Sequence, residues 1–165
     1  MFFLSDACCH DKVVDVKTIC AKTKNPSFCS KLLNSMPGGV SGADFNSIMK
    51  YTFDVMHGNV TNTIELINKL IAKGNLDVST KFHLEFCLGS FISAKNDVEY
   101  TREFFYSKDY GSVGFALDDT THLSKACLAF PPRYKDSSLL PKYVEVLEQV
   151  IQIIGVIFNS FCMIA

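Results

Sequence analysis

Hydrophobic residues recur at steps of three and four along most of the chain, and sustained two-residue alternation is nearly absent. This spacing is typical of α-helices with one apolar face. The clearest stretch predicts a long helix that opens at Ser41, with Asp44 three residues later as in a capping box, and closes at Gly74-Asn75. Its apolar stripe is Phe45, Met49, Phe53, Met56, Val60, Ile64, Ile67 and Ile71.

Three further long helices are predicted, over about 78–106, over about 109–130 and from about residue 140 onward. Pro131-Pro132 ends the second of these, and Pro141 fits the first turn of the third. The inward positions of the first are Leu84, Cys87, Phe91, Ala94, Val98, Thr101 and Phe105. Those of the second are Val113, Leu117, Thr120, Ser124 and Cys127. Those of the third are Leu140, Val144, Leu147, Val150, Ile154, Ile157 and Phe161.

Two short helices precede the long ones, over 13–21 and 27–34, and Lys24-Asn25-Pro26 separates them. We therefore predict an all-α fold, in which an N-terminal α-hairpin precedes an up-and-down antiparallel four-helix bundle. In this division residues 1–12 form an N-terminal tail, 13–36 the hairpin and 41–165 the bundle.

The size and charge of the chain exclude several classes of protein. Its 165 residues suit one domain, and 16 Lys and Arg against 17 Asp and Glu leave a formal net charge of −1. Without a basic surplus, no nucleic-acid partner is expected. The apolar segment 150–165 is shorter than the roughly 20 residues of a bilayer span, so we expect a buried helix and no membrane anchor.

Seven cysteines indicate a disulfide framework with one thiol left over, and therefore a secreted protein. Met1-Phe2-Phe3-Leu4 is too short for the apolar region of a signal peptide, so we expect the signal to be incomplete in this sequence. Cys8, Cys9 and Cys162 have no evident partners, and a bond from Cys8 or Cys9 to Cys162 is the less favoured arrangement.

Two cysteine pairs fit the predicted helices. A bond between Cys20 and Cys29 would tie the two short helices together and contribute about 2.7 kcal/mol on a chain-entropy model. Cys87 and Cys127 lie on inward stripes, about 21 residues before and about 19 after the turn near Lys108, and so at similar heights. Their bond would contribute about 3.9 kcal/mol. The alternative is that Cys87 is a small buried hydrophobic residue.

No catalytic, metal or cofactor site is predicted. Cys8-Cys9-His10-Asp11 superficially resembles the active-site run of secreted phospholipases A2, but no glycine-rich calcium loop precedes it. His57, His83 and His122 stand alone on different helices, and we interpret them as surface or hydrogen-bonded core residues. Asn59-Val60-Thr61 is a glycosylation sequon, and Asn59 is therefore a candidate for a glycan.

The cysteine-containing segments resemble those of the plant invertase and pectin methylesterase inhibitor family. Cys20 to Cys29, with Thr23 and Pro26 between them, is similar to the family's C-x-x-T-x-x-P-x-x-C opening. Cys87, followed by Phe91 and Ala94, is similar to its C-x-x-x-Y-x-x-A, with Phe in place of Tyr. The interval from Asp109-Tyr110 to Cys127 suits the third bundle helix, and the resemblance extends over nearly the whole chain.

The resemblance implies a secreted cell-wall protein without catalytic activity, with the first and second and the third and fourth framework cysteines paired. Residues 13–165 then form an inhibitor domain that binds an enzyme. Invertase inhibitors of this family insert a Pro-Lys-Phe loop into the sucrose site, but here Asp109-Tyr110-Gly111-Ser112 stands in its place. This favours pectin methylesterase as the partner, with acid invertase as the alternative.

Two departures leave a third possibility, a same-fold structural or allergen-like protein without an enzyme target. Ala126 stands where methylesterase inhibitors usually carry Thr, and Leu128-Ala129 replaces their acidic residues. Our main prediction is a monomeric inhibitor that covers the substrate cleft of pectin methylesterase one-to-one. The contacts are expected from exposed polar residues of the second and third bundle helices, with Glu99, Arg102, Asp118 and Thr121 as candidates.

Overall fold

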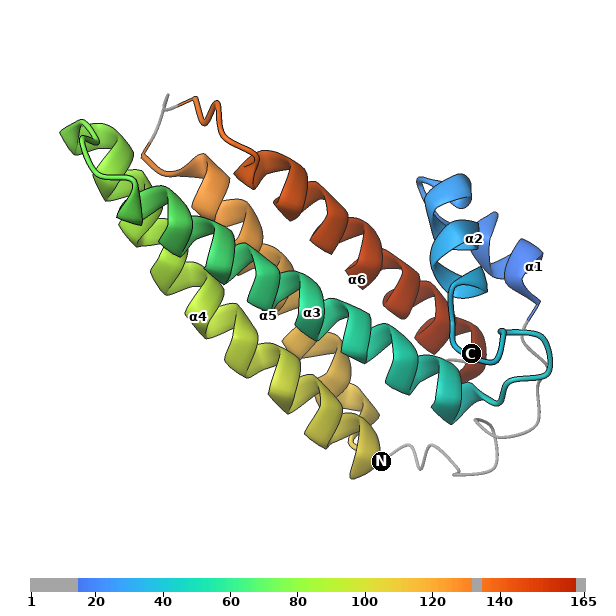
Figure 1. The fold of residues 1–165 in the computed structure, drawn as a ribbon. Helices are drawn as coiled ribbons and strands as arrows, with labels where there is room; N and C mark the ends of the chain where they lie inside the picture. Colours follow the sequence, from blue (N-terminus) through green and yellow to red (C-terminus); the bar gives the residue numbers. More distant parts are fainter. Residues whose placement is uncertain (1–14, 132–134, 163–165) are drawn as a thin grey trace. The chain divides into compact units, whose positions relative to one another are not determined.

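The computed structural model describes residues 15–131 and 135–162, and all regular secondary structure in these ranges is α-helical (Figure 1). The helices are α1 (Val16–Cys20), α2 (Pro26–Asn34), α3 (Phe45–Ala72), α4 (Val78–Tyr106), α5 (Tyr110–Ala129) and α6 (Leu140–Cys162). The predicted fold, a hairpin of short helices followed by a four-helix bundle, is confirmed. Residues 1–14 lie outside the described ranges, and so do the predictions for Cys8, Cys9 and His10.

Short polar side chains begin the helices. Asn25 caps α2, Asp77 caps α4 and Asp109 caps α5, each accepting a hydrogen bond from the backbone N–H three residues later, at 3.1, 3.0 and 3.3 Å. Such caps satisfy N–H groups that have no partner within the helix. Hydrogen bonds from Thr80 hold the pKa of Asp77 below its usual value. The predicted bounds of α4 agree with the structure.

The start of α3 differs from the prediction. The helix begins at Phe45, not at Ser41, because the carboxylate of Asp44 is itself the cap and accepts a 2.9 Å bond from the backbone N–H of Ser47. The hydroxyl of Ser47 donates to the same carboxylate at 2.9 Å, and these bonds lower the pKa of Asp44. An Asp at the cap position thus replaces the predicted capping box.

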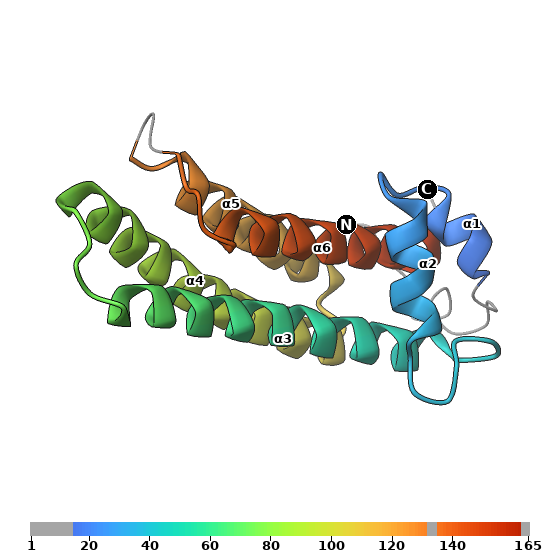
Figure 2. The same cartoon turned by 45° about the horizontal axis from the view of Figure 1, so that its top comes forward.

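The chain divides into two compact units, and the first contains α1, α2, the start of α3 to residue 54 and the end of α6 from residue 149. Figure 2 shows the short helices α1 and α2 joined by a tight turn. The Asn25 side-chain amide donates to Gln149 Oε1, and the backbone N–H of Lys24 donates to Gln152 Oε1, both at 3.0 Å. The rings of Phe45 and Phe161 stack with centroids 5.0 Å apart. The turn of the hairpin is therefore bonded to α6.

The second unit, residues 55–148, contains the rest of α3, all of α4 and α5, and the start of α6. Helices α4 and α5 lie side by side (Figure 1). Every predicted inward residue of these two helices is buried. Their connection is short, only residues 107–109, which makes them antiparallel neighbours.

The stripe of α3 needs one correction. Ile64 and Ile71 are only partly buried, whereas Thr63, which the hydrophobic pattern omits, is fully buried. At 100° per residue, position 63 lies about 20° from Met56 around the helix and position 64 about 80° away. Thr63 can enter the core because its hydroxyl donates a 2.7 Å bond to the Asn59 carbonyl.

Helix α6 is long and apolar enough, by length and composition alone, for residues 140–161 to cross a membrane, and no other helix in the described residues is. Half of that stretch is buried within the protein. All predicted inward positions of α6, from Leu140 to Phe161, are among these buried residues. This burial supports the predicted interpretation of α6 as a core helix.

Candidate functional site

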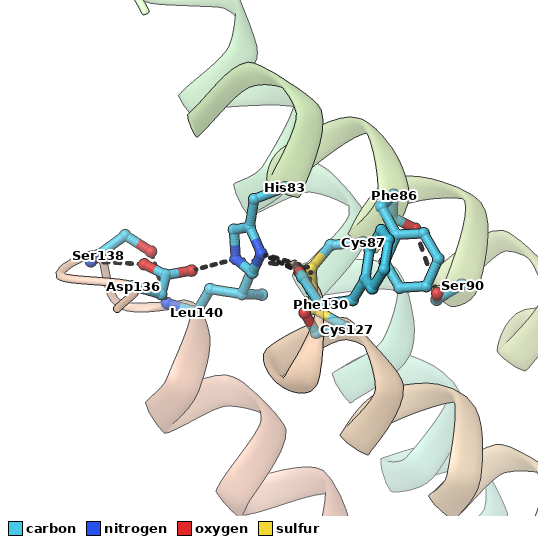
Figure 3. Close-up of a disulfide and its surroundings, with 9 residues drawn as sticks. All are labelled: His83, Phe86, Cys87, Ser90, Cys127, Phe130, Asp136, Ser138 and Leu140. Carbon is cyan, nitrogen blue, oxygen red and sulfur yellow. Dashed lines mark hydrogen bonds and ion pairs between the residues drawn. A yellow bond between two sulfur atoms is a disulfide. The ribbon is translucent and has the colours of Figure 1, made fainter. Parts of the chain in front are cut away.

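A disulfide joins α4 and α5 of the second unit. Cys87 of α4 and Cys127 of α5 are bonded, with their Cα atoms 4.5 Å apart, and both are fully buried (Figure 3). The bond couples residues 40 positions apart in the sequence. It therefore restrains α4 and α5, the two helices from which partner contacts are expected.

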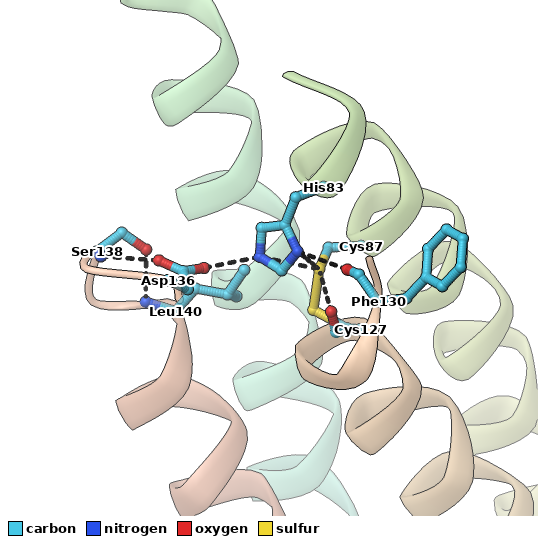
Figure 4. Close-up of polar contacts among 7 residues, drawn as sticks. All are labelled: His83, Cys87, Cys127, Phe130, Asp136, Ser138 and Leu140. Atoms are coloured by element: carbon cyan, nitrogen blue, oxygen red, sulfur yellow. Dashed lines mark hydrogen bonds and ion pairs between the residues drawn. A yellow bond between two sulfur atoms is a disulfide. The ribbon is translucent and has the colours of Figure 1, made fainter. Parts of the chain in front are cut away.

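A buried histidine lies one turn before this disulfide. His83 Nδ1 is 2.8 Å from the carbonyl oxygen of Phe130, and Nε2 is 2.9 Å from Oδ2 of Asp136 (Figure 4). The carbonyl oxygen can only accept, so Nδ1 carries a proton. The second contact then requires a further proton on either Nε2 or the carboxyl group of Asp136. The pair as a whole is therefore electrically neutral, which suits its burial.

The same network positions the start of α6. The Asp136 carboxylate accepts a 2.7 Å bond from the backbone N–H of Ser138, and the Ser138 hydroxyl accepts one of 3.1 Å from the backbone N–H of Leu140. The side chains of His83 and Asp136 are 0% and 6% exposed. Phe130, after α5, and Asp136, before α6, are thus both bonded to His83 of α4 beside the disulfide. His83 is a hydrogen-bonded core residue, one of the two interpretations given to the histidines.

Two charged side chains and a histidine meet on another side of α4. Glu99 lies 3.1 Å from His57 Nε2 of α3 and 3.9 Å from Arg102 of α4. The Glu99 side chain is 48% exposed, so this group faces solvent. The structure thus brings together two of the four candidate contact residues, Glu99 and Arg102, and adds His57 to them.

The other two candidates lie on α5. Asp118 is exposed, and Thr121 is partly buried with its hydroxyl donating a 3.0 Å bond to the Leu117 carbonyl. Asp119, next to Asp118, faces Asp97 of α4 and, after burial, contributes to raising the pKa of Asp97. Because Glu99 follows Asp97 by two residues on α4, it lies about 200° further around that helix. The candidates of α4 and α5 therefore occupy separate parts of the surface.

Large exposed apolar side chains on α4 and α5 were missed when only polar residues were considered. Phe115 of α5 is 75% exposed, and Tyr100 and Ile92 of α4 are 51% and 50% exposed. Aromatic residues contribute a large share of the binding energy at protein interfaces. The signal in the sequence was a large apolar residue at a position outside the helical stripe.

A second exposed aromatic group lies beside the disulfide. Figure 3 shows the rings of Phe130 and Phe86 side by side, and their centroids are 4.6 Å apart. The centroid of the Phe82 ring is 5.6 Å from that of Phe130. The three rings are between 36% and 49% exposed.

Among the described residues, no group of three or more His, Cys, Asp or Glu could hold a metal ion.

The family model for plant invertase/pectin methylesterase inhibitors matches residues 14–129. The chain belongs to this family. The match extends from the hairpin through α5, and it includes both pairs of bonded cysteines.

Three curated relatives carry the name pectinesterase inhibitor. Pectinesterase inhibitor 1 of Arabidopsis thaliana is 27% identical over 128 residues, which are 76% of this chain and 70% of the relative. Pectinesterase inhibitor 2 of the same plant is 28% identical over 66% of this chain and 62% of the relative. The inhibitor of Actinidia deliciosa is 28% identical over 59% and 52%.

Solved structures extend the similarity to most of the fold. A mutant form of a pectin methylesterase inhibitor from Arabidopsis has a TM-score of 0.75 and 26% identity, covering 88% of this chain and 96% of the other. A pectin methylesterase inhibitor structure from Arabidopsis thaliana has a TM-score of 0.65 and 27% identity, with 88% and 95% covered.

Proposed function

We propose that this chain is a secreted cell-wall protein that inhibits pectin methylesterase by binding it one-to-one as a monomer. The observation that carries the proposal is the similarity to pectin methylesterase inhibitors, in sequence and over 88% of the chain in structure. The chain acts through binding and not through catalysis, because the inhibitor covers the substrate cleft and keeps the polysaccharide out.

The pair of helices α4 and α5 supplies the binding surface in this proposal. The Cys87–Cys127 disulfide joins these two helices, and the His83–Asp136 pair bonds α4 to the segment just before α6. A surface that is already ordered loses less conformational entropy when it docks. The contacts come from the candidates Glu99, Arg102, Asp118 and Thr121, and we add Phe115 as an exposed aromatic anchor.

A titration tests the proposal directly. A fixed amount of plant pectin methylesterase is mixed with increasing amounts of the purified, oxidised protein, and released methanol is measured. We expect activity to fall linearly and to reach its minimum at one inhibitor per enzyme. Unchanged activity at a tenfold molar excess of the protein would reject the proposal.

Parallel arms separate the alternatives. The same titration on sucrose hydrolysis by acid invertase identifies an invertase inhibitor, and a lack of complex with either enzyme indicates a structural or allergen-like protein. Phe115→Ser is expected to weaken inhibition of the methylesterase about tenfold, equivalent to about 1.4 kcal/mol. Glu99→Gln and Asp118→Asn test the polar candidates. Glu65→Gln, an exposed change on α3, is the matched control and leaves inhibition unchanged.

A further inference from the structure

A groove of about 420 Å³ opens in the second unit between α3 and the beginning of α6. Its volume falls within the roughly 300–1,000 Å³ of sites for small molecules. The lining combines two carboxamides, an ammonium group, a phenol ring and two aliphatic side chains. These belong to Asn59, Asn62, Lys142, Tyr143, Leu139 and Val146.

This lining suits a sugar ring. The apolar face of a pyranose packs on an aromatic ring and on aliphatic carbon atoms, and its hydroxyl and acetamide groups need donors and acceptors. The carboxamide of Asn62 offers both, and Lys142 offers a donor. The groove therefore has the chemistry to hold one acetamido sugar.

One wall of the groove is the asparagine of the Asn59-Val60-Thr61 sequon. The Asn59 side-chain nitrogen donates a 2.8 Å hydrogen bond to the Val55 carbonyl. A carboxamide nitrogen has two hydrogens, so one can keep this bond while the other is replaced by a sugar. Attachment is therefore compatible with the observed position of the side chain.

The hydroxyl of the third sequon residue makes no hydrogen bond in the folded helix. The Thr61 hydroxyl is buried, and among the described residues it has no hydrogen-bond partner. Thr63, two residues later, donates to a backbone carbonyl. A buried hydroxyl without a partner lowers the stability of the fold and calls for an explanation. The enzyme that transfers the oligosaccharide would recognise this hydroxyl in the sequon before α3 forms.

We infer that Asn59 carries an N-linked glycan whose first N-acetylglucosamine lies in this groove against Tyr143. The inference rests on the proposed secretion of the protein. In the transfer, Asn59 Nδ2 loses a proton and bonds to the anomeric carbon of the sugar. The bond from that carbon to the diphosphate of a lipid-linked oligosaccharide donor breaks, and the lipid diphosphate leaves.

Intact-mass measurement of the protein secreted from plant cells tests attachment. We expect a mass increase that peptide-N-glycosidase A removes, that Asn59→Gln and Thr61→Val abolish, and that Thr61→Ser retains. Thr61→Val also removes the unpartnered hydroxyl, so it folds even if Asn59→Gln does not. A secreted wild-type protein without the added mass would overturn the inference.

A second measurement tests the position of the sugar. In NMR spectra of the glycosylated protein, the Tyr143 ring is expected to shift the N-acetyl methyl resonance of the first sugar. Tyr143→Leu keeps apolar bulk and removes the ring current, and should return this resonance to its position in a free glycopeptide. An identical resonance in the two proteins would show that the sugar does not lie against Tyr143.

Failure of this inference and failure of the proposed function give different results. The secreted wild-type protein and Thr61→Val are both titrated against pectin methylesterase. An unglycosylated protein that still inhibits the enzyme overturns only the inference about Asn59. A glycosylated protein that inhibits neither methylesterase nor invertase overturns only the proposed function.

Discussion

The two disulfides join helices of very different length. Cys20–Cys29 spans 9 residues in sequence and joins helices of 5 and 9 residues. Cys87–Cys127 spans 40 and joins helices of 29 and 20 residues. Helices shorter than about 12 residues are marginal in water. The first bond thus maintains elements that cannot persist alone, whereas the second restrains elements that also pack along their length.

The polar surroundings of the two bonds also differ. Near Cys20–Cys29, Lys24 and Asn25 make exposed hydrogen bonds to the side chains of Gln152 and Gln149. Beside Cys87–Cys127, the His83–Asp136 pair is buried, and Cys87 Sγ lies 3.7 Å from His83 Nε2. Water can replace the exposed bonds when they are lost, but not the buried pair. We therefore expect the second region to be more sensitive to loss of a polar group.

Loss of His83 is expected to have the largest effect. His83→Leu removes the imidazole partner of the buried Asp136 carboxyl group and leaves it only the bond from the Ser138 backbone N–H. This loss lowers the free energy of unfolding by about 3–5 kcal/mol. Urea denaturation measures the loss. His122→Leu, an exposed change on α5, is the matched control. The double change His83→Leu with Asp136→Leu should recover part of the stability, because no charge then remains buried. A single-variant loss below about 1 kcal/mol would contradict the importance of the pair.

Removal of the long-range disulfide is expected to rank next. Cys87→Ala with Cys127→Ala lowers the free energy of unfolding by about 3.9 kcal/mol, because the unfolded chain regains the entropy of a large loop. Denaturation is compared under oxidising conditions, so that Cys20–Cys29 stays intact. If the free energy of unfolding falls less in this variant than in the variant without Cys20–Cys29, the expected order of the two stabilising effects is wrong.

Removal of the hairpin disulfide is expected to cost about 2.7 kcal/mol, and its effect should be local. In Cys20→Ala with Cys29→Ala, the amides of α1 and α2 are expected to exchange hydrogen faster. Those of α4 and α5 should keep their protection. Hydrogen exchange followed by mass spectrometry measures both regions in one sample. Equal acceleration in α4 would show that the hairpin bond stabilises the whole protein.

The smallest effect concerns the like charges between α4 and α5. Burial and the neighbouring Asp119 raise the pKa of Asp97 above 3.8. The ionised form is therefore less favourable in the folded state, and this penalty develops as pH rises above that value. Asp97→Asn should raise Tm slightly at neutral pH, and the gain should vanish at a pH where both carboxyl groups are protonated. Glu65→Gln, an exposed change on α3, is the control. A lower Tm of Asp97→Asn than of the unchanged protein at neutral pH would contradict the expected direction.

Local patterns in the sequence predicted most of the fold. The bounds of α4 and the inward residues of α4, α5 and α6 follow from apolar spacing, because burial of a continuous face is the main stabilising force of a bundle. The predicted start of α3 was wrong by several residues, because Ser41 and Asp44 can each cap a helix. Only the hydrogen bonds of Asp44 with Ser47 in the folded chain decide between them.

The candidate site was less predictable. Glu99 and Arg102 are three residues apart on one helix, so their contact follows from helical geometry. His57 joins them only because α3 packs beside α4. Asp118 lies on a separate part of the surface, which depends on how α5 is rotated against α4. Phe115 lies outside the predicted stripe of α5, so its exposure could have been inferred from the spacing, but a search limited to polar contact residues passed over it.

The sequence by itself determined the helices, their apolar faces and the cysteines available for pairing, because these depend on spacing along the chain. Tertiary structure decided that His83 meets Asp136, 53 residues away, and that the Thr61 hydroxyl is buried without a partner. Such contacts depend on the rotation of each helix about its own axis relative to its neighbours. Packing of the whole core sets that rotation, and no local pattern encodes it.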